Sequence, residues 1–399
     1  MKRSKLLAML LLLMVVAMPA MAQTTLFETV EGQPPYRIPA IATAKNGDVI
    51  ALSDYRPCFN DIGYGRVDIK QRVSKDNGKT WGEMTEVLTG TGEGLTTGFG
   101  DACLVADRNS NELLLACVAG NMTYWASSLA NPQHLVTIHA YLDKKTGEWV
   151  WDKQFKDHTL HIYHTLLHDK VRALFMGSGR ISQSSRVKVG KYYRIYGALC
   201  THEGNFVLYS DDFGRNWNVL GDSYNVCVPK GDEPKCEELP NGDVLISSRK
   251  DGGRYFNIFH YTNKKTADGQ WDKCVDSREC PGGISNSGTP TDGEIMILPW
   301  KKDGKKCHVA LQSIPAGPKR SNVTIYYKYL ESIADYSTPL AFASNWDGEY
   351  QVSDKGSAYS TMTLQKDGTI GFYYEEEPLN YQMVYKNLKL EEILSGGKL

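Results

Sequence analysis

The sequence predicts an all-β protein, a six-bladed β-propeller built from four-stranded antiparallel blades. Short β-rich runs such as VLISSR, YFNIFHY and NVTIYYKYL alternate with Gly, Asn and Asp turns, and helical periodicity is scarce. A box of the form S-x-D-x-G-x-x-W occurs at 74–81 and 210–217, with degenerate copies at 143–149 and 266–271. The tryptophans of these boxes, at 81, 149, 217 and 271, lie 68, 68 and 54 residues apart. A repeat of about 63 residues fits about six propeller blades in this chain.

The chemistry of the box favours a structural role. Its Asp can accept backbone N–H groups in a tight turn, its Gly can adopt a positive φ, and its Trp can fill the gap between sheets. We therefore interpret the box as a turn motif and not as a calcium loop or a catalytic Asp. The residues concerned are Asp76, Gly78 and Trp81 in the first box and Asp212, Gly214 and Trp217 in the other complete one.

The N-terminus has the pattern of a secretory signal peptide. Lys2, Arg3 and Lys5 precede the apolar run LLAMLLLLMVVAM, and Ala-Met-Ala at 20–22 provides a small-residue cleavage site. The run is too short to predict a membrane span. We expect residues 1–22 to be removed and residues 23–399 to form the exported domain, which would be periplasmic or secreted.

Composition and charge exclude several classes of function. The chain has 45 basic and 46 acidic residues, so nothing indicates binding to nucleic acid or to an anionic membrane. Its nine cysteines are an odd number, and Cys274 and Cys280 are the closest plausible disulfide. No CxxC or HExxH motif occurs, and the histidines between His158 and His168 lack a cysteine partner. We therefore expect no metal and no cofactor.

A predicted hairpin near the N-terminus carries charges that do not suit a core. Arg37 opens its first strand, Arg56 ends its second, and Asp61 follows on the next loop. Because a hairpin brings the start of one strand beside the end of the next, these three charges can converge. The hairpin therefore indicates a polar site at one end of the propeller.

These motifs, taken in order, resemble those of the bacterial exo-sialidases, six-bladed propellers that remove terminal sialic acid. The resemblance rests on the Asp boxes, on Arg37-Ile38-Pro39, on EPKCEELPNGDVLISSR at 233–249 and on SAYSTMTLQKDGTIGFYYE at 357–375. It covers essentially all of residues 23–399. A sialidase substrate is negatively charged beside its anomeric carbon, which suits guanidinium donors and a neutral tyrosine nucleophile.

The resemblance implies a role for each of nine residues. Tyr359 would be the nucleophile, Glu233 its base and Asp61 the general acid/base, while Glu237 and Glu238 compete with Glu233 for the role of base. The substrate-binding residues would be Arg37, Arg249 and Arg320 at the carboxylate, Arg56 at the carboxylate or the O4 side, and Asp101 near the O4 and N-acetyl groups, with Glu375 supporting Arg37.

The sequence thus predicts a monomeric, retaining exo-α-sialidase acting on sialylated glycans. Three alternatives stay open at this point. The same residues would serve a glycosidase for another 2-keto acid sugar such as Kdn or Kdo, or an intramolecular trans-sialidase. A propeller that binds glycans without cleaving them is the third, although it has no need of Asp61, Glu233 and Tyr359 together.

Overall fold

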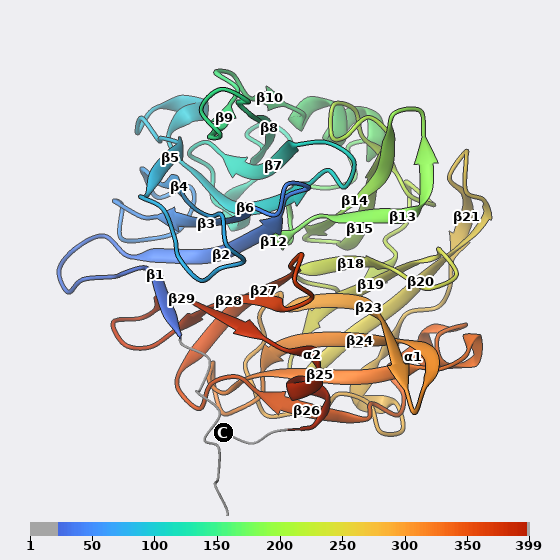
Figure 1. Cartoon of the computed structure of the whole chain (residues 1–399). Coiled ribbons are helices and arrows are strands. Elements are labelled where there is room, and N and C mark those ends of the chain that lie inside the picture. Colours follow the sequence, from blue (N-terminus) through green and yellow to red (C-terminus); the bar gives the residue numbers. More distant parts are fainter. Residues whose placement is uncertain (1–22, 397–399) are drawn as a thin grey trace, which may run out of the picture.

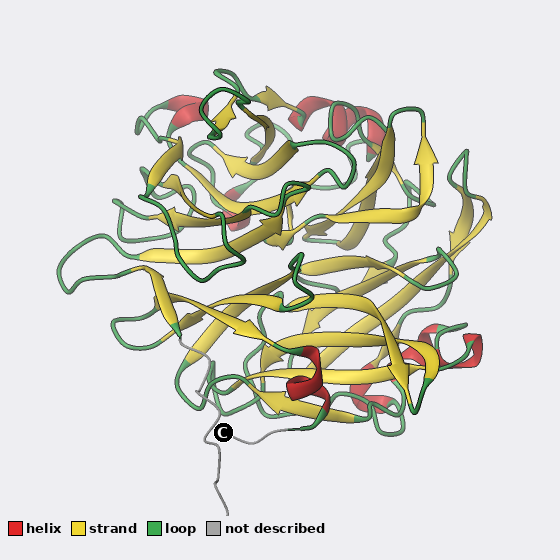
Figure 2. Cartoon of the chain, viewed as in Figure 1, coloured by secondary structure: helices red, strands yellow, loops and turns green. Residues whose placement is uncertain are grey.

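The computed structural model describes residues 23–396, so the signal peptide expected at 1–22 lies outside the described residues. Six β-sheets are arranged as the blades of a propeller (Figure 1). Strands and loops make up nearly all of the chain, with a few short helical segments at the periphery (Figure 2). The predicted all-β, six-bladed architecture is confirmed.

Each blade has a core of four antiparallel strands, and blades 2, 3 and 4 carry additional short strands. Blade 1 contains β2 (Tyr36–Thr43), β3 (Val49–Tyr55), β4 (Asp68–Ser74) and β5 (Thr85–Leu88). Blade 2 contains β6 (Phe99–Ala106), β7 (Glu112–Ala119), β8 (His134–Leu142) and β9 (Trp149–Trp151), with β10 (Lys156–Asp157) and β12 (Gly179–Arg180). Blade 3 contains β11 (Leu174–Met176), β14 (Tyr192–Thr201), β15 (Gly204–Ser210) and β16 (Asn218–Val219), with β13 (Ser182–Val189) and β17 (Val228–Pro229).

The second half of the chain forms blades 4 to 6. Blade 4 contains β18 (Pro234–Glu238), β19 (Val244–Lys250), β20 (Gly253–Asn263) and β21 (Asp268–Trp271), with β22 (Val275–Asp276). Blade 5 contains β23 (Glu294–Lys302), β24 (Lys305–Pro315), β25 (Val323–Leu330) and β26 (Gly348–Gln351). Blade 6 contains β27 (Ser357–Leu364), β28 (Ile370–Glu376), β29 (Gln382–Leu388) and β1 (Thr24–Phe27). The helical segments are α1 (Pro339–Ala343), α2 (Leu390–Leu394), a π-helical segment (His161–Leu166), and single turns at Gly94–Thr96, Tyr124–Ala126, Ser277–Glu279 and Ile333–Asp335.

The ring closes by pairing the two ends of the described chain. Strand β1 pairs antiparallel with β29, with Thr24 opposite Tyr385, and so completes the last blade. Because the ring is closed in this way, each blade packs between two neighbouring blades and no blade face at the end of the series is left exposed.

The Asp boxes lie where the sequence predicted turns, between the third and fourth strands of blades 1 to 4. In the box at 210–217, Asp212 accepts hydrogen bonds from the Asn216 N–H at 2.8 Å and from the Ser210 hydroxyl at 2.8 Å. Gly214 has a φ of 80°, and a Cβ there would lie 2.3 Å from Leu114 of blade 2. Trp217 is buried in the same core cluster as Leu114. The box therefore joins neighbouring blades, as a structural motif would.

The topology assigns the boxes and the predicted polar site to opposite ends of the propeller. In each blade the first strand begins, and the second strand ends, at the same end of the sheet. The turn between the third and fourth strands lies at the other end. Residues at the starts of β2, β6, β18 and β27 therefore meet those at the ends of β3, β19 and β28, and this end is called the mouth below.

The expected disulfide does not form. All nine cysteines are free thiols, and Cys274 and Cys280 are among them. Cys280 packs in the core between blades 4 and 5, while Cys274 contacts a different cluster between blades 3 and 4. Proximity in sequence was a poor guide because the two side chains join separate hydrophobic clusters.

Candidate active site at the propeller mouth

Three innermost strands carry a β-bulge close to the mouth. The register shifts between Arg37 and Pro39 in β2, between Gly100 and Cys103 in β6, and between Ser357 and Ser360 in β27. Each bulge inserts one extra residue and redirects the side chains beside it. Ile38 and Asp101 take φ values of 59° and 53°, a strained conformation for residues with a Cβ. The bulges thus place Arg37, Asp101 and Tyr359 at the mouth.

Tyr359 and Glu233 form a short hydrogen-bonded pair between blades 6 and 4. The Tyr359 hydroxyl donates to Glu233 Oε1 at 2.5 Å. Burial and the charge of Glu233 raise the pKa of Tyr359 well above its usual value, while Arg249 and Arg320 act in the opposite direction. The phenol is therefore neutral at rest, and the carboxylate that can accept its proton is already in contact with it.

Two arginines flank this pair. Arg249, near the end of β19, places Nη1 2.9 Å from Glu233 Oε2 and 3.5 Å from the Tyr359 hydroxyl, and its Nε lies 3.2 Å from Asp232. Arg320, on the loop between β24 and β25, lies with its guanidinium carbon 5.4 Å from the centre of the Tyr359 ring. The pair therefore sits in a cationic environment that suits an anionic ligand.

Arg37 is held by the buried carboxylate of Glu375. Its Nε and Nη2 donate to the two oxygens of Glu375 at 2.7 and 3.2 Å. The same carboxylate accepts the backbone N–H groups of Ile38 at 2.8 Å and Tyr359 at 3.2 Å, so it ties the bulges of β2 and β27 together. Although burial opposes it, Glu375 raises the pKa of Arg37, which keeps the guanidinium charged.

A second cluster surrounds Arg56 at the end of β3. Its Nη2 lies 3.0 Å from Asp61 Oδ1 and 3.2 Å from Asp54 Oδ2. Asp61 is 60% exposed on its loop, whereas Asp54 is fully buried. Burial, followed by the charges of Asp61 and Asp54, raises the pKa of Asp101 well above its usual value. The guanidinium of Arg56 thus forms ion pairs with two carboxylates, and its charge acts on the pKa of Asp101 in the opposite direction to burial.

Comparisons with known proteins show what the chain resembles. The chain is 28% identical over 368 residues to the sialidase of Micromonospora viridifaciens, covering 86% of this chain and 50% of that protein. It is 23% identical over 357 residues to the sialidase of Paraclostridium sordellii, covering 88% of this chain and 83% of that protein. The chain is therefore similar in sequence to two curated sialidases over most of its length. No protein-family model matches the chain.

Solved structures of sialidases share the fold. An intramolecular trans-sialidase from Ruminococcus gnavus, in complex with oseltamivir carboxylate, superimposes with a TM-score of 0.67 at 17% identity, covering 90% of this chain and 96% of that one. Trypanosoma rangeli sialidase in complex with the inhibitor DANA gives a TM-score of 0.68 at 16% identity, covering 94% and 60% of the two chains. The chain spans about half the length of the Micromonospora relative, covering 50% of that protein.

The structure places the nine residues that the sequence predicted for the site in three groups. Tyr359 lies with Glu233, Arg249 and Arg320, while Arg37 lies with Glu375 and Arg56 with Asp61 and Asp101. The two competing glutamates have other partners, because Glu237 pairs with Arg180 at 2.5 Å and Glu238 accepts from Ser185. Of the three glutamates, Glu233 is the one bonded to Tyr359.

Three further residues of the mouth were not predicted from the sequence. Asp54 lies behind Arg56, Asp232 contacts Arg249, and the ring of Tyr381 lies 4.8 Å from the guanidinium carbon of Arg37. The spacing Asp54-x-Arg56 was a usable signal, since residues two apart in a strand share a face. Asp232 and Tyr381 are distant in the sequence from Arg249 and Arg37, and only the fold brings each of them to its partner.

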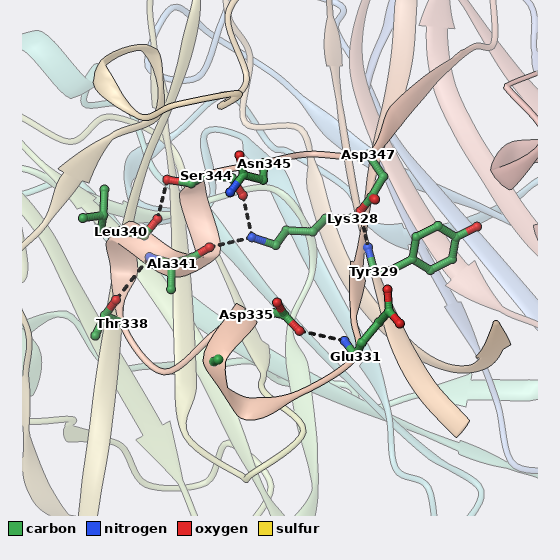
Figure 3. Close-up of a pocket in the computed structure, with 11 residues that line it drawn as sticks. Lys328, Tyr329, Glu331, Asp335, Thr338, Leu340, Ala341, Ser344, Asn345 and Asp347 are labelled. Atoms are coloured by element: carbon green, nitrogen blue, oxygen red, sulfur yellow. Dashed lines mark hydrogen bonds between the residues drawn. The ribbon is translucent and has the colours of Figure 1, made fainter. Parts of the chain in front are cut away.

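A separate pocket on blade 5 contains none of these residues. Figure 3 shows it beside α1, with Lys328, Asp335 and Asp347 among the residues that line it. Lys328 Nζ donates to the carbonyls of Ala341 and Ser344, both at 2.5 Å, and so satisfies the C-terminal end of α1. This lysine has a structural role.

Two absences hold for residues 23–396. No group of three or more His, Cys, Asp or Glu side chains is arranged to hold a metal ion. Three of the clustered histidines bond to different partners: His158 to Thr137, His164 to Asp169 and His168 to Ser223. None of the helices in this part of the chain has the length and apolar character needed to cross a bilayer.

Proposed function

We propose that this chain is a retaining exo-α-sialidase that hydrolyses terminal sialic acid from glycoconjugates. The observation that carries the proposal is the hydrogen bond from Tyr359 to Glu233 among the arginines of the mouth. A phenol paired with a carboxylate is a nucleophile with its own base. The kinship with sialidases in sequence supports the same conclusion.

The substrate carboxylate would bind to Arg37, Arg249 and Arg320. Arg37 is already oriented by Glu375, and Arg249 by Glu233 and Asp232, so little side-chain freedom is lost when the ligand binds. Charge-assisted hydrogen bonds of this type contribute roughly 1.5–3 kcal/mol each. Arg56 would contact the carboxylate or the O4 side of the sugar, and Asp101 the region of O4 and the N-acetyl group.

The first half of the reaction would form a covalent intermediate. Glu233 accepts the proton of Tyr359 as the phenol oxygen attacks the anomeric carbon, and the glycosidic bond breaks. Asp61 gives its proton to the departing oxygen, so the aglycone leaves as a neutral alcohol. A carboxylate nucleophile would be repelled by the substrate carboxylate at this step, whereas the neutral phenol is not.

The second half would release sialic acid. Asp61, now ionised, takes a proton from a water molecule, whose oxygen attacks the anomeric carbon. The bond to Tyr359 breaks and the phenol recovers its proton from Glu233. Two inversions at one carbon return the α configuration of the substrate.

The proposal is tested by product stereochemistry and by trapping. Proton NMR of the first product released from an α-sialoside should show the α anomer. A 3-fluorinated sialosyl fluoride should leave an adduct visible by intact mass, and peptide mapping should place it on Tyr359. A β product formed first, or an adduct on Glu233 or Asp61, would contradict this assignment.

An intramolecular trans-sialidase is the second candidate. The fold of one such enzyme, from Ruminococcus gnavus, matches this chain over 96% of its own length. The same residues would act, and attack by a hydroxyl group of the substrate would replace attack by water. NMR of the product distinguishes free sialic acid from an anhydro sugar. Fluorogenic Kdn and Kdo glycosides, assayed beside the sialoside, test the other sugar classes, and no turnover of any of them would indicate a binding protein.

Export through a cleaved N-terminal signal peptide and a monomeric state stay predictions. N-terminal sequencing of the secreted protein should begin at or near Gln23. Sedimentation analysis of the same material should give the mass of one chain.

A further inference from the structure

Asp54 is a fully buried carboxylate of β3 that the mechanism above does not use. Its Oδ2 lies 3.2 Å from Arg56 Nη2 and accepts the backbone N–H of Asp101 at 3.3 Å. Its Oδ1 has no hydrogen-bond partner among the described residues. Burying a carboxylate is costly unless both of its oxygens are paired, and Asp54 Oδ1 is not, so this position is poorly explained by stability alone.

The neighbouring strand is shaped around this carboxylate. A Cβ on Gly100 of β6 would lie 2.7 Å from Asp54 Oδ2, so a side chain there would collide with the carboxylate. Asp101, the next residue, lies in the β6 bulge with a φ of 53° and points its N–H at Asp54. Asp54 therefore joins the bulge of β6 to the end of β3, where Arg56 begins the loop that carries Asp61.

We propose that Asp54 is a positioning residue for leaving-group protonation: it fixes the guanidinium of Arg56, and Arg56 in turn holds Asp61 in line with the glycosidic oxygen. Asp61 needs this support because its side chain is 60% exposed on a loop. The same Nη2 of Arg56 contacts both carboxylates, at 3.2 and 3.0 Å. This inference rests on the proposed sialidase activity.

Burial and ion pairing act in opposite directions on Asp54 and Arg56. Burial raises the pKa of Asp54 to about 7, and the guanidinium of Arg56 opposes that shift. For Arg56, burial lowers the pKa but the charges of Asp54 and Asp61 outweigh it, so the guanidinium stays charged. The other titratable groups close to this pair are Arg37 on β2, Asp101 on β6, Cys117 on β7 and Tyr373 on β28.

The test compares two leaving groups. Sialyllactose releases a poor leaving group that must be protonated, whereas a nitrophenyl sialoside releases a phenolate that departs without an acid. Asp54→Asn should lower kcat/KM about tenfold on sialyllactose and less than about threefold on the nitrophenyl substrate. Binding of DANA, measured by calorimetry, should weaken much less than turnover of sialyllactose.

Asp68→Asn is the matched control. Asp68 is equally buried in the same blade, and within residues 23–396 its carboxylate pairs with Arg66 at 2.9 Å, Lys70 at 3.5 Å and the Gly90 N–H at 2.9 Å, none of which belongs to the site. Its replacement should leave the ratio of the two kcat/KM values unchanged. Equal losses on both substrates in Asp54→Asn, or the same change of ratio in Asp68→Asn, would overturn the proposal.

A double-variant cycle tests whether Asp54 acts through Arg56 even if Asp54→Asn alone folds poorly. Arg56→Gln combined with Asp54→Asn leaves no unpaired guanidinium in the core. If Asp54 acts through Arg56, the double variant should match Arg56→Gln within about twofold on sialyllactose. A further tenfold loss would refute that route. No cleavage by the wild type would refute the proposed function itself, whereas equal losses in variants of an active enzyme refute only the role of Asp54.

Discussion

Replacing Asp212 by alanine should destabilise the propeller and leave its chemistry intact. The Asp212 carboxylate accepts hydrogen bonds from the Asn216 N–H at 2.8 Å, the Asn216 side-chain amide at 2.6 Å and the Ser210 hydroxyl at 2.8 Å. All three close the turn between β15 and β16, at the end of blade 3 opposite the mouth. Alanine removes these acceptors without adding bulk.

The expected loss follows from the number of hydrogen bonds. At about 1 kcal/mol each, the three bonds give a loss of about 3 kcal/mol in the free energy of unfolding. Unfolding entropies of about 2 cal/mol/K per residue over about 370 residues convert this to a fall of about 4 °C in Tm. Burial raises the pKa of Asp212, but the hydrogen bonds from Asn216 outweigh burial and lower it. The stabilisation by the Asp212 carboxylate is therefore present above about pH 4 and is lost as the pH falls further.

Calorimetry of the wild type and the variant at pH 7 measures the effect, and the gap in Tm should narrow toward pH 3. Asp152→Ala is the control, because this exposed side chain makes no hydrogen bond or ion pair within residues 23–396. The kcat of the folded Asp212→Ala protein should stay within about twofold of wild type. An unchanged Tm with lost activity would refute the structural interpretation of the box.

Four further predictions test the site and the core. Tyr359→Phe should lower kcat by several orders of magnitude while DANA still binds, because one oxygen is lost from a buried ring; near-normal turnover would remove Tyr359 as nucleophile. Arg320→Lys should lower kcat/KM about tenfold or more at an unchanged Tm, because a point charge cannot replace a planar fork, and wild-type kinetics would exclude Arg320 from the site. Dithiothreitol should leave Tm unchanged because all nine cysteines are free, and a large fall would reveal a disulfide. Iodoacetamide at pH 8 should spare Cys274, since burial raises the pKa of that thiol to about 12.

Local sequence was enough to predict the blades. Strand alternation and the turn chemistry of Asp212 and Gly214 act over a few residues, and the box tryptophans recur at a regular interval, so all three can be recognised in the sequence alone. The motif order was equally informative for the site, because the strand ends of a propeller converge and bring Arg37, Glu233 and Tyr359 together.

Long-range packing decided what the sequence left open. The amino-acid sequence does not predict the one-residue bulges that place Asp101 and Tyr359, because a bulge depends on the register of the neighbouring strand. Glu233, and not Glu237 or Glu238, contacts Tyr359 because of how blades 4 and 6 pack.

The prediction of a Cys274–Cys280 disulfide was wrong, and the place of Asp54 in the site was not predicted. Both have the same cause. A sequence gives the separation of two residues along the chain but not the distance across an interface between sheets. Cys274 and Cys280 are close in sequence yet enter different core clusters. Asp54 and Asp101 are 47 residues apart, yet they share a hydrogen bond. The chain by itself determined the repeating blades and the residues that carry the chemistry, while the tertiary structure decided which of them meet, because that depends on how whole sheets pack around one axis.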